Sequence, residues 1–430
     1  MALPTQPYKG ARDFYPADKR AQKYMFNTMR SVVERYGYEE YDAPIIEPLE
    51  LYLSKSSEEI VTEQTYSFED RGGRKVTIRP EMTPTVSRMV AAKRQELAYP
   101  LRWYSIPNLW RYERPQRGRL REHWQLNVDI FGVEALTAEM EIIFVADAIM
   151  KAYGATPDMY AIRLNSRKLI NAILHDYVSE DVDKVLPVIR LIDHKAKMPH
   201  DEFFAALSKL VDSEKAKELH ELLSVQSFDD LPEKYGKHAS VQELMELKKL
   251  LAVGGVTNIV DDLSLMRGFD YYTDIVFEVF DTNPENNRSM FGGGRYDGLV
   301  GLFGAESVAS VGFGMGDVTL QDFLDVHSLL PASRSETDAY IALVDGLSPG
   351  VQKAASDLRK MSLNVAVDLS GRSIDKQIKT AVKKGINYVI FIGAKELADE
   401  QFTLKNLETG KEEKTDLKSI ATILKDSRQQ

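Results

Sequence analysis

The chain has 430 residues and a formal net charge of −10, with 43% hydrophobic and 28% charged residues. This length allows two or three domains, and the acidic balance argues against a protein that coats nucleic acid through a general excess of lysine and arginine. No stretch approaches about 20 uninterrupted apolar residues, and the first residues lack the apolar core of a secretory signal. We therefore expect a cytoplasmic protein without a membrane span.

The chain contains no cysteine, which excludes a disulfide framework and a thiolate zinc site. Its seven histidines include no pair three or four residues apart, so we predict no metal site on a helix. We expect most of these histidines to be surface or packing residues.

The first predicted elements are a helix and an edge strand. Apolar or aromatic residues recur at helical spacing over residues 17–36, and Gly37 ends this helix. Residues 38–53 have the composition of a strand that is interrupted at Pro44. Because proline lacks the backbone N–H, we expect this strand at a sheet edge or at a bulge.

A short strand over residues 76–79 leads to Thr83 and Pro84, which favour the start of a helix. Glu81 lies between the strand and the helix. From its position alone, Glu81 is interpreted as a glutamate in the first turn of a helix, where the helix dipole favours a negative charge.

The central feature is an arginine-rich segment inside an acidic chain. Six arginines and two glutamates lie between residues 101 and 124, a local charge of +4. The flanking residues 103–110 and 124–132 are aromatic and branched runs of strand length, which predicts strand, loop and antiparallel strand. The planar guanidinium groups suit phosphate or carboxylate oxygens. A solvated basic hairpin is the alternative, but the interleaved aromatics favour a polyanion site.

Helical patterns dominate the middle of the chain. An amphipathic helix is predicted over residues 137–153 and a strand over 159–165. Residues 170–250 are rich in Lys, Glu, Asp and Leu with helical spacing and no evident chemistry, so we interpret them as an inserted helical subdomain.

Two segments with further chemical interest follow. In residues 264–280, Arg267 and a Tyr-Tyr pair precede an alternating strand, which would suit an anion clamp beside an aromatic slot or, for the tyrosines alone, a packed core. Residues 291–304 are rich in glycine, which lets backbone approach a ligand closely. Residues 308–324 read as a glycine-rich strand that opens into a helix.

The C-terminal part has the pattern of a separate domain. Residues 326–336 have linker composition, and strands and helices then alternate, with one hairpin. Residues 337–430 carry 15 Lys and Arg against 13 Asp and Glu, a net of +2. A mildly basic module beside an acidic body suits an RNA contact.

The motif RYERPQRGRLREHWQ, residues 111–125, resembles the second signature motif of class II aminoacyl-tRNA synthetases, in the form used by histidyl-tRNA synthetases. Residues 267–272, RGFDYY, resemble the histidyl family's own signature. The helix and edge strand near the N-terminus resemble the first motif, which builds the dimer interface in that family. Residues 308–324 resemble the third motif.

This resemblance implies an α+β fold, in which an antiparallel class II sheet is flanked by helices. It assigns residues 1–169 and 251–325 to the catalytic core and residues 170–250 to a helical insertion that clamps the acceptor stem of tRNA. Residues 326–336 would be the linker, and residues 337–430 an α/β anticodon-binding domain.

The resemblance also assigns roles to individual residues. Arg111 and Arg267 would be catalytic and hold the α-phosphate and the reacting carboxylate from opposite sides. ATP would be bound by Arg111, Glu113, Arg119 and Arg267. Residues 114–121 would form the loop over ATP and the tRNA acceptor end, with Arg114, Gln116 and Arg117 at the tRNA. Histidine would be bound by Glu81, Thr83, Gln125, Asp129, Tyr271, Tyr272 and Tyr296.

Within this set, the residues for the imidazole also have a geometric argument. Gln125, Asn127 and Asp129 occupy alternate positions of one predicted strand, so their side chains share a face. Asp129 would accept a hydrogen bond from an imidazole N–H, and Tyr272 would serve the other nitrogen. A site of this kind rejects analogues that lack the group far better than an apolar slot does.

The implied reaction joins histidine and ATP into histidyl-adenylate and pyrophosphate, and then transfers histidine to tRNA(His). Mg²⁺ would arrive with ATP, and the protein would be a homodimer. One position departs from the family pattern, because Thr319 stands where the third motif usually has an arginine that packs on adenine.

Two alternatives are open. A non-catalytic paralogue, such as the histidine-sensing regulatory subunit of ATP phosphoribosyltransferase, is favoured by Thr319. It is opposed by the retained Arg111, Glu81, Arg267 and Tyr272 and by the C-terminal domain, which that regulator lacks. A general RNA-binding scaffold fits the basic hairpin but gives residues 267–272 no purpose.

Overall fold

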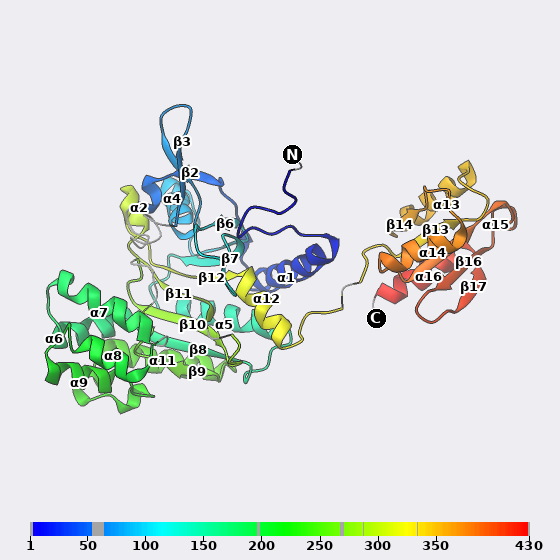
Figure 1. The fold of residues 1–430 in the computed structure, drawn as a ribbon. Helices are drawn as coiled ribbons and strands as arrows, with labels where there is room; N and C mark the ends of the chain where they lie inside the picture. The colour runs from blue at the N-terminus through cyan, green and yellow to red at the C-terminus, as the bar shows by residue number, and fades with distance from the viewer. Residues whose placement is uncertain are drawn as a thin grey trace. The chain divides into compact units, whose positions relative to one another are not determined.

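The computed structural model of the chain divides into two compact units, Met1–Pro331 and Ala332–Gln430. Each unit is described by itself (Figure 1). The structure describes residues 3–53, 64–195, 198–266, 271–286, 288–332 and 334–428. Within these ranges, no helix is both long and apolar enough to cross a bilayer.

A mixed nine-stranded sheet forms the centre of the first unit. Its order is β1 (Glu39–Glu40), β5 (Leu101–Ser105), β7 (Glu122–Phe131), β12 (Ser310–Gly316), β11 (Ser289–Arg295), β10 (Ile275–Asp281), β8 (Tyr160–Ser166) and β9 (Ile259–Asp261), while β6 (Asn108–Trp110) also pairs with β7. The six strands from β5 to β8 run antiparallel, and only the outer pairs β1–β5 and β8–β9 are parallel. The predicted α+β fold with a largely antiparallel sheet is confirmed.

Helices pack against this sheet through their apolar faces. Helix α1 (Pro16–Arg35) confirms the helix that the apolar spacing predicts, and α5 (Thr137–Ala152) confirms the next long one. Both contribute to one core cluster with the buried side chains of β7 and β8. Helix α12 (Asp317–Val326) directly follows β12.

The prediction of one interrupted strand over residues 38–53 is wrong. After β1 the chain leaves the main sheet, and β2 (Ile46–Pro48) joins the hairpin of β3 (Tyr66–Glu69) and β4 (Lys75–Ile78) in a separate three-stranded sheet. Helix α2 (Glu50–Leu53) follows. Pro44 and Pro48 explain the break, because each removes a backbone donor from the ladder. Both β1 and β2 lie at sheet edges, as the prolines predict.

The predicted strand over residues 103–110 is also divided, into β5 and β6, with Ile106 and Pro107 between them. Both pieces pair antiparallel with β7, which confirms the strand, loop and strand arrangement. Helix α4 (Thr83–Lys93) begins at the predicted residue.

The segment between β8 and β9 is helical, as predicted. It contains α6 (Arg167–Tyr177), α7 (Val182–His194), α8 (His200–Leu207), α9 (Ser213–Leu222), α10 (Glu233–Gly236) and α11 (Ala239–Val253). Figure 1 shows these green helices gathered at the β8–β9 end of the sheet.

The second unit is a five-stranded mixed sheet with helices on both faces. Its order is β14 (Val365–Val367), β13 (Ala339–Leu343), β15 (Tyr388–Ile392), β16 (Phe402–Asn406) and β17 (Glu412–Thr415). Helices α13 (Pro349–Lys360) and α16 (Leu417–Arg428) pack on one face and α14 (Ile374–Lys383) on the other, while α15 (Ala394–Asp399) precedes β16. The first three strands are parallel and the last two form the predicted hairpin, which confirms the α/β pattern.

Candidate functional site

The floor of the candidate site consists of a polar strand face and a neighbouring strand of glycines. Gln125, Asn127 and Asp129 share one face of β7, as their spacing predicts, and β12 places Gly314 opposite Asn127 and Gly312 opposite Asp129. A Cβ atom at Gly312 would lie 2.1 Å from Asp129 Oδ1, and one at Gly314 would lie 1.8 Å from Gln125 Nε2. The glycines of β12 therefore leave the space that the polar side chains occupy.

The sequence predicts that glycines 292–294 let the backbone approach a ligand, but in the structure they let two strands approach each other. They lie within β11, and a Cβ atom at Gly293 would lie 1.9 Å from the carbonyl oxygen of Gly312 and 2.7 Å from Cβ of Phe313. Gly293 thus permits close contact between β11 and β12.

A side chain at Gly312 should disturb the site more than the fold. We expect Gly312→Ala to push Asp129 away and to raise KM for histidine, the substrate that the resemblance implies. We also expect it to cost about 1–3 kcal/mol of stability, because the carbonyl of Val128 is only 2.7 Å from the new Cβ. Steady-state kinetics and thermal unfolding measure the two effects. Gly298→Ala is the matched control, because no heavy atom lies within 4 Å of its Cβ position.

A cavity of about 350 Å³ lies above this floor. The structure brings all the residues that the sequence assigns to histidine to its lining: Glu81, Thr83, Gln125, Asp129, Tyr271, Tyr272 and Tyr296. Arg111 lines it as well. These side chains come from segments that are far apart in the sequence.

One corner of the cavity is acidic. Glu81 is only 3% exposed, and the hydroxyl of Tyr271 donates to its Oε2 at 3.2 Å and approaches Thr83 Oγ1 at 3.5 Å. Glu81 precedes Met82, the residue that caps α4, so it does not lie in the first helical turn. Its buried carboxylate lies in the cavity lining.

The lining also contains a second buried carboxyl group, that of Asp129, with one oxygen available. Tyr296 donates its hydroxyl to Asp129 Oδ1 at 2.5 Å, whereas Oδ2 is buried without a hydrogen-bond partner among the described residues. Burial raises the pKa of Asp129 to about 7, although the bond from Tyr296 acts in the opposite direction. A ligand that donates an N–H to Oδ2 would satisfy this atom.

A larger cleft of about 890 Å³ adjoins this cavity and shares Arg111, Gln125 and Gly314 with it. Arg111 donates from Nε to the carbonyl of Pro80 at 2.9 Å, which fixes the guanidinium at the junction of the two spaces. Glu113 and Arg119, which the sequence assigns to ATP, also line the cleft, and Arg119 Nε lies 3.2 Å from Glu113 Oε2.

Two ionisable residues of this cleft, His123 and Glu278, are missing from the predicted site residues. The sequence predicts that most histidines are surface or packing residues, whereas His123 lines the cleft. Burial, and then the charges of Arg111 and Arg12, lower the pKa of His123 to about 3, so its imidazole is neutral at physiological pH. His123 precedes Gln125 by two positions on β7, so the same alternation could have identified it. Glu278 of β10 lines the cleft as well.

The loop residues assigned to tRNA are exposed, namely Arg114, Gln116 and Arg117. Arg121 differs from the expectation that residues 114–121 all contribute to the loop surface, because it is only 9% exposed. Its guanidinium stacks 3.9 Å above the ring of Tyr112 and donates to the hydroxyl of Tyr8 at 2.9 Å. Arg121 therefore anchors the loop from within.

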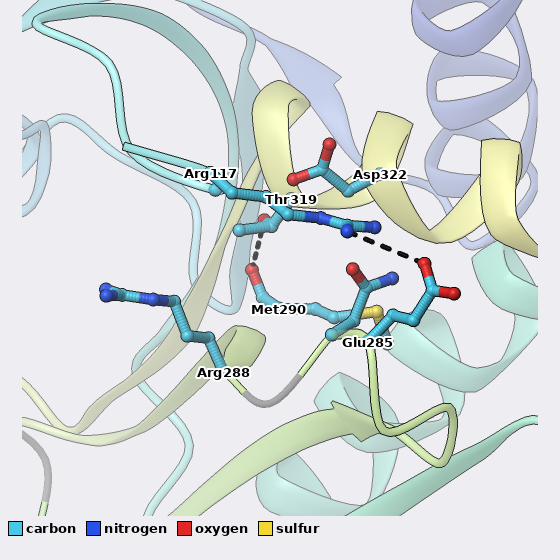
Figure 2. A pocket seen from close by; sticks show the side chains of 8 residues that line it. Arg117, Glu285, Arg288, Met290, Thr319 and Asp322 are labelled. Carbon is cyan, nitrogen blue, oxygen red and sulfur yellow. Dashed lines mark hydrogen bonds and ion pairs between the residues drawn. The ribbon is translucent and has the colours of Figure 1, made fainter. Parts of the chain in front are cut away.

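A third cavity, of about 350 Å³, lies beside the larger cleft and shares Gly118, Met290 and Thr319 with it (Figure 2). Arg117 and Arg288 both contribute to its lining. The predicted catalytic residue Arg267 lies outside the residues that the structure describes.

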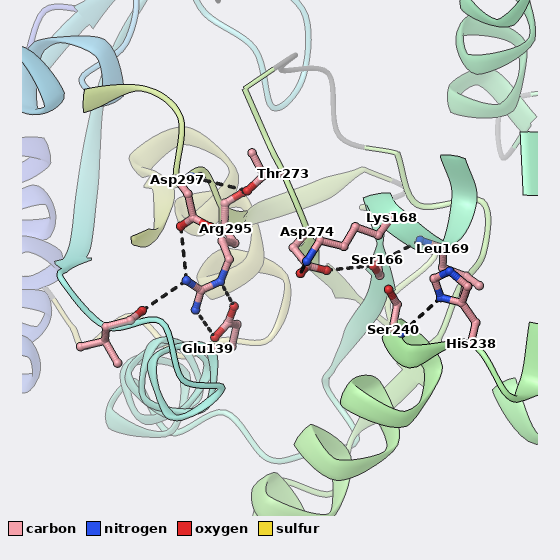
Figure 3. A network of polar contacts seen from close by, with 11 residues as sticks. Glu139, Ser166, Lys168, Leu169, His238, Ser240, Thr273, Asp274, Arg295 and Asp297 are labelled. Carbon is pink, nitrogen blue, oxygen red and sulfur yellow. Dashed lines mark hydrogen bonds and ion pairs between the residues drawn. The ribbon is translucent and has the colours of Figure 1, made fainter. Parts of the chain in front are cut away.

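A buried polar network supports the tyrosines of the first cavity (Figure 3). Arg295 forms a bidentate ion pair with Glu139, with distances of 2.5 and 2.8 Å, and its carbonyl accepts from the backbone N–H of Thr273 at 2.8 Å. Tyr296 and Tyr272 are the neighbours of these residues in the chain. The network thus fixes the backbone on which both tyrosines stand.

Known proteins resemble this chain over nearly its whole length. Residues 10–318 match the histidyl-tRNA synthetase family, and residues 338–427 match an anticodon-binding domain. The histidine–tRNA ligase of Leptospira biflexa serovar Patoc is 45% identical over 411 residues, which cover 94% of each chain. The corresponding ligase of Haloarcula marismortui is 39% identical over 411 residues, again with 94% of each chain covered.

Solved structures agree in fold. The histidyl-tRNA synthetase from Nostoc sp. PCC 7120 superposes with a TM-score of 0.84 at 24% identity, and the match covers 99% of this chain and 100% of that one. A protein described as an ATP phosphoribosyltransferase regulatory subunit/histidyl-tRNA synthetase from Bacillus halodurans gives 0.73 at 22% identity, with 91% and 99% covered. Since the match to the histidyl-tRNA synthetase family spans residues 10–318 and the identity to curated relatives reaches 45%, the chain belongs to the histidyl-tRNA synthetase family of class II aminoacyl-tRNA synthetases.

Proposed function

We propose that this protein is an ATP-dependent histidine–tRNA ligase. It activates histidine to histidyl-adenylate with release of pyrophosphate, and then transfers histidine to the 3′ end of tRNA(His). The observation that carries this proposal is the position of Arg111, which lines both the cavity above the β7 face and the larger cleft. A carboxylate in the first space and an α-phosphate in the second would meet at its guanidinium.

The chemistry at that junction is positioning and charge stabilisation. A carboxylate oxygen attacks the α-phosphorus while pyrophosphate leaves, so two anions must approach and negative charge develops on the phosphoryl oxygens. Arg111 is fixed in advance by its bond to Pro80, so little reorganisation is needed when that charge develops. Arg267 is proposed to act from the other side of the phosphorus.

Histidine would be selected at both of its ends. The carboxylate of Glu81, with Thr83 and Tyr271, is proposed to bind the ammonium group. Asp129 Oδ2 would accept from the imidazole N–H, and Tyr272 would serve the second nitrogen, with Gln125 and Tyr296 completing the pocket. Because these polar groups are buried, an amino acid whose side chain leaves them without hydrogen bonds would bind with a less favourable free energy.

ATP would occupy the larger cleft, with Arg119 at the outer phosphates. Mg²⁺ would enter as part of the Mg–ATP substrate. Glu113 and Glu278 are carboxylates in the lining of that cleft, and Mg²⁺ in nucleotide sites commonly binds one or two carboxylates together with phosphate oxygens.

The partners follow from the same proposal. The exposed loop residues Arg114, Gln116 and Arg117, the helices between β8 and β9, and the C-terminal unit are proposed to contact tRNA(His). We also propose a homodimer, which the exposed apolar side chains Ile45, Ile46 and Phe68 around the small sheet support, and a cytoplasmic location, where tRNA is charged.

The second candidate is a histidine-sensing paralogue that does not charge tRNA. Thr319 is the observation that favours it. The shared position of Arg111 in both spaces and the anticodon-binding match at residues 338–427 favour the enzyme.

Histidine-dependent exchange of labelled pyrophosphate into ATP separates these functions. The ligase is expected to catalyse the exchange only when histidine is present. A sensing paralogue would bind histidine in calorimetry without exchange, and an RNA-binding scaffold would do neither. Absence of exchange with intact histidine binding would overturn the proposed enzyme.

A further inference from the structure

Thr319 leaves the nucleotide cleft without the guanidinium that the family usually supplies at this position. Its hydroxyl donates to the carbonyl of Met290 at 2.7 Å and lies 3.4 Å from that of Gly316, so the side chain is turned to the backbone. Thr319 lies where the larger cleft and the third cavity meet, since it lines both. A planar side chain that packs on the adenine base of a bound nucleotide would therefore have to come from another residue.

Arg288 is available at that junction. It is half-buried and lines the third cavity, and within the described part of the chain its guanidinium makes no hydrogen bond or ion pair. A Cβ atom at Gly118 would lie 3.4 Å from Thr319 Cγ2 and 3.7 Å from Arg288 Cδ, so the two side chains flank the same glycine of the loop. A half-buried arginine without an anionic partner is well suited to bind a ligand.

The other arginine of the cavity is already engaged. Arg117 Nη1 lies 3.6 Å from Glu285 Oε2. Figure 2 shows the guanidinium of Arg117 directed at Glu285, whereas that of Arg288 extends away from Glu285 on the opposite side. Of the two, Arg288 is the one free to face a ligand.

The charge of the third cavity favours a base over a phosphate. Its lining contains the carboxylates of Glu285 and Asp322 and the amide of Asn286, together with the apolar side chain of Met290. Carboxylates repel phosphate oxygens, but they accept hydrogen bonds from an exocyclic amine. An aromatic ring with an amino group matches this lining.

We propose that Arg288 packs its guanidinium on the adenine ring of ATP and so replaces the arginine that is absent at position 319, with the third cavity as the base subsite. This inference rests on the proposed function, because it assumes that the cleft beside Arg111 holds ATP. Guanidinium groups stack on aromatic faces through their planar, weakly hydrated surface, and an ammonium group has no such plane.

The test uses the full-length protein and Arg288→Ala. We expect KM for ATP in histidine-dependent exchange to rise about tenfold, with KM for histidine unchanged, and the inhibition constant of adenosine to rise by a similar factor. Arg288→Lys should resemble the alanine variant, because it keeps the charge but loses the plane. The control is Arg74→Ala, which removes an exposed arginine of the β3–β4 hairpin that pairs with Asp70 and should keep wild-type constants.

Other outcomes overturn the inference. If Arg288 binds the outer phosphates, the alanine variant will raise KM for pyrophosphate, leave adenosine inhibition unchanged and be rescued by lysine. If KM for ATP and adenosine inhibition stay at wild-type values, Arg288 has no role at the base, and the ligase function stands. Should the wild type show no exchange, adenosine binding by calorimetry to wild type and Arg288→Ala still decides the base contact. Equal thermal midpoints exclude misfolding.

Discussion

Replacing Arg111 by alanine is expected to lower kcat/KM for histidine-dependent pyrophosphate exchange by about 10³-fold, or about 4 kcal/mol of transition-state stabilisation. Arg111 is a cation that lines both the cavity proposed for histidine and the cleft proposed for ATP, and its bond to Pro80 holds it between them. The charge it faces grows as the reaction proceeds, so we expect the loss mainly in kcat. Exchange kinetics at varied histidine and ATP measure this split.

Two variants distinguish the planar shape and location of the Arg111 guanidinium from its positive charge alone. Arg111→Lys keeps a positive charge but lacks the fork that binds two oxygens at once, and it should recover only part of the activity. Arg74→Ala removes an exposed arginine that lines none of the three cavities and should leave the kinetics unchanged. Near-wild-type exchange by Arg111→Ala would contradict the role of this residue. Arg267→Ala is expected to impair the same step.

The elements that the sequence predicts well are those in which one repeated pattern dominates. Helix α1 has apolar residues at helical spacing and a glycine after its end, and the C-terminal unit alternates strands with helices. The strand predicted over residues 38–53 fails because Pro44 and Pro48 break the ladder and let the chain join a second sheet. Proline indicates the break, but which sheet each fragment joins depends on partners far away in the sequence.

In the candidate site, too, local patterns predict some features, whereas others depend on residues far away in the sequence. Alternation on β7 predicts that Gln125 and Asp129 share a face, and the structure adds that Gly312 and Gly314 lie opposite that face. The role of the β12 glycines follows from this strand register. The register cannot be predicted from the residues around each glycine. His123 continues the alternation, but a single histidine carries no distinctive chemical signal.

Arg288 illustrates a limit of a different kind. It precedes β11 in a polar loop, and nothing in the surrounding residues distinguishes it from an ordinary surface arginine. Arg288 becomes a candidate ligand-binding residue because Gly118 of the loop between β6 and β7 and Thr319 of α12 lie beside it. The threonine at position 319 and an arginine at position 288 without an ion pair among the described residues become related only when the chain is folded.

Asp129 connects the specificity of the site to the stability of the protein. Burial raises its pKa from 3.8 to about 7, so between these values the folded state binds more protons than the unfolded state does. Stability that the protonated carboxyl contributes is complete below pH 3.8 and is lost as the pH rises towards 7, by at most about 4 kcal/mol. Above pH 7 the protein without ligand carries a buried charge, and one of its oxygens has no hydrogen-bond partner among the described residues.

Asp129→Asn is therefore expected to lower activity and raise stability at the same time. At pH 8 we expect kcat/KM for histidine to fall about 100-fold, since a charge-assisted hydrogen bond to the imidazole is lost, while the unliganded variant unfolds at a higher temperature than wild type. Exchange kinetics and thermal unfolding from pH 4 to pH 8 measure both. The stability difference should shrink towards pH 4, where the wild-type carboxyl is protonated.

Tyr296→Phe provides the matched control for this interpretation. The hydroxyl of Tyr296 donates to Asp129 Oδ1 and thereby lowers the pKa of that carboxyl, so its removal should move the pH dependence of histidine binding to higher pH. Asp129→Asn should show no such titration in either background. If the asparagine variant kept wild-type kcat/KM for histidine across this range, Asp129 would be a structural residue, and the imidazole would have to be recognised by other groups of the cavity.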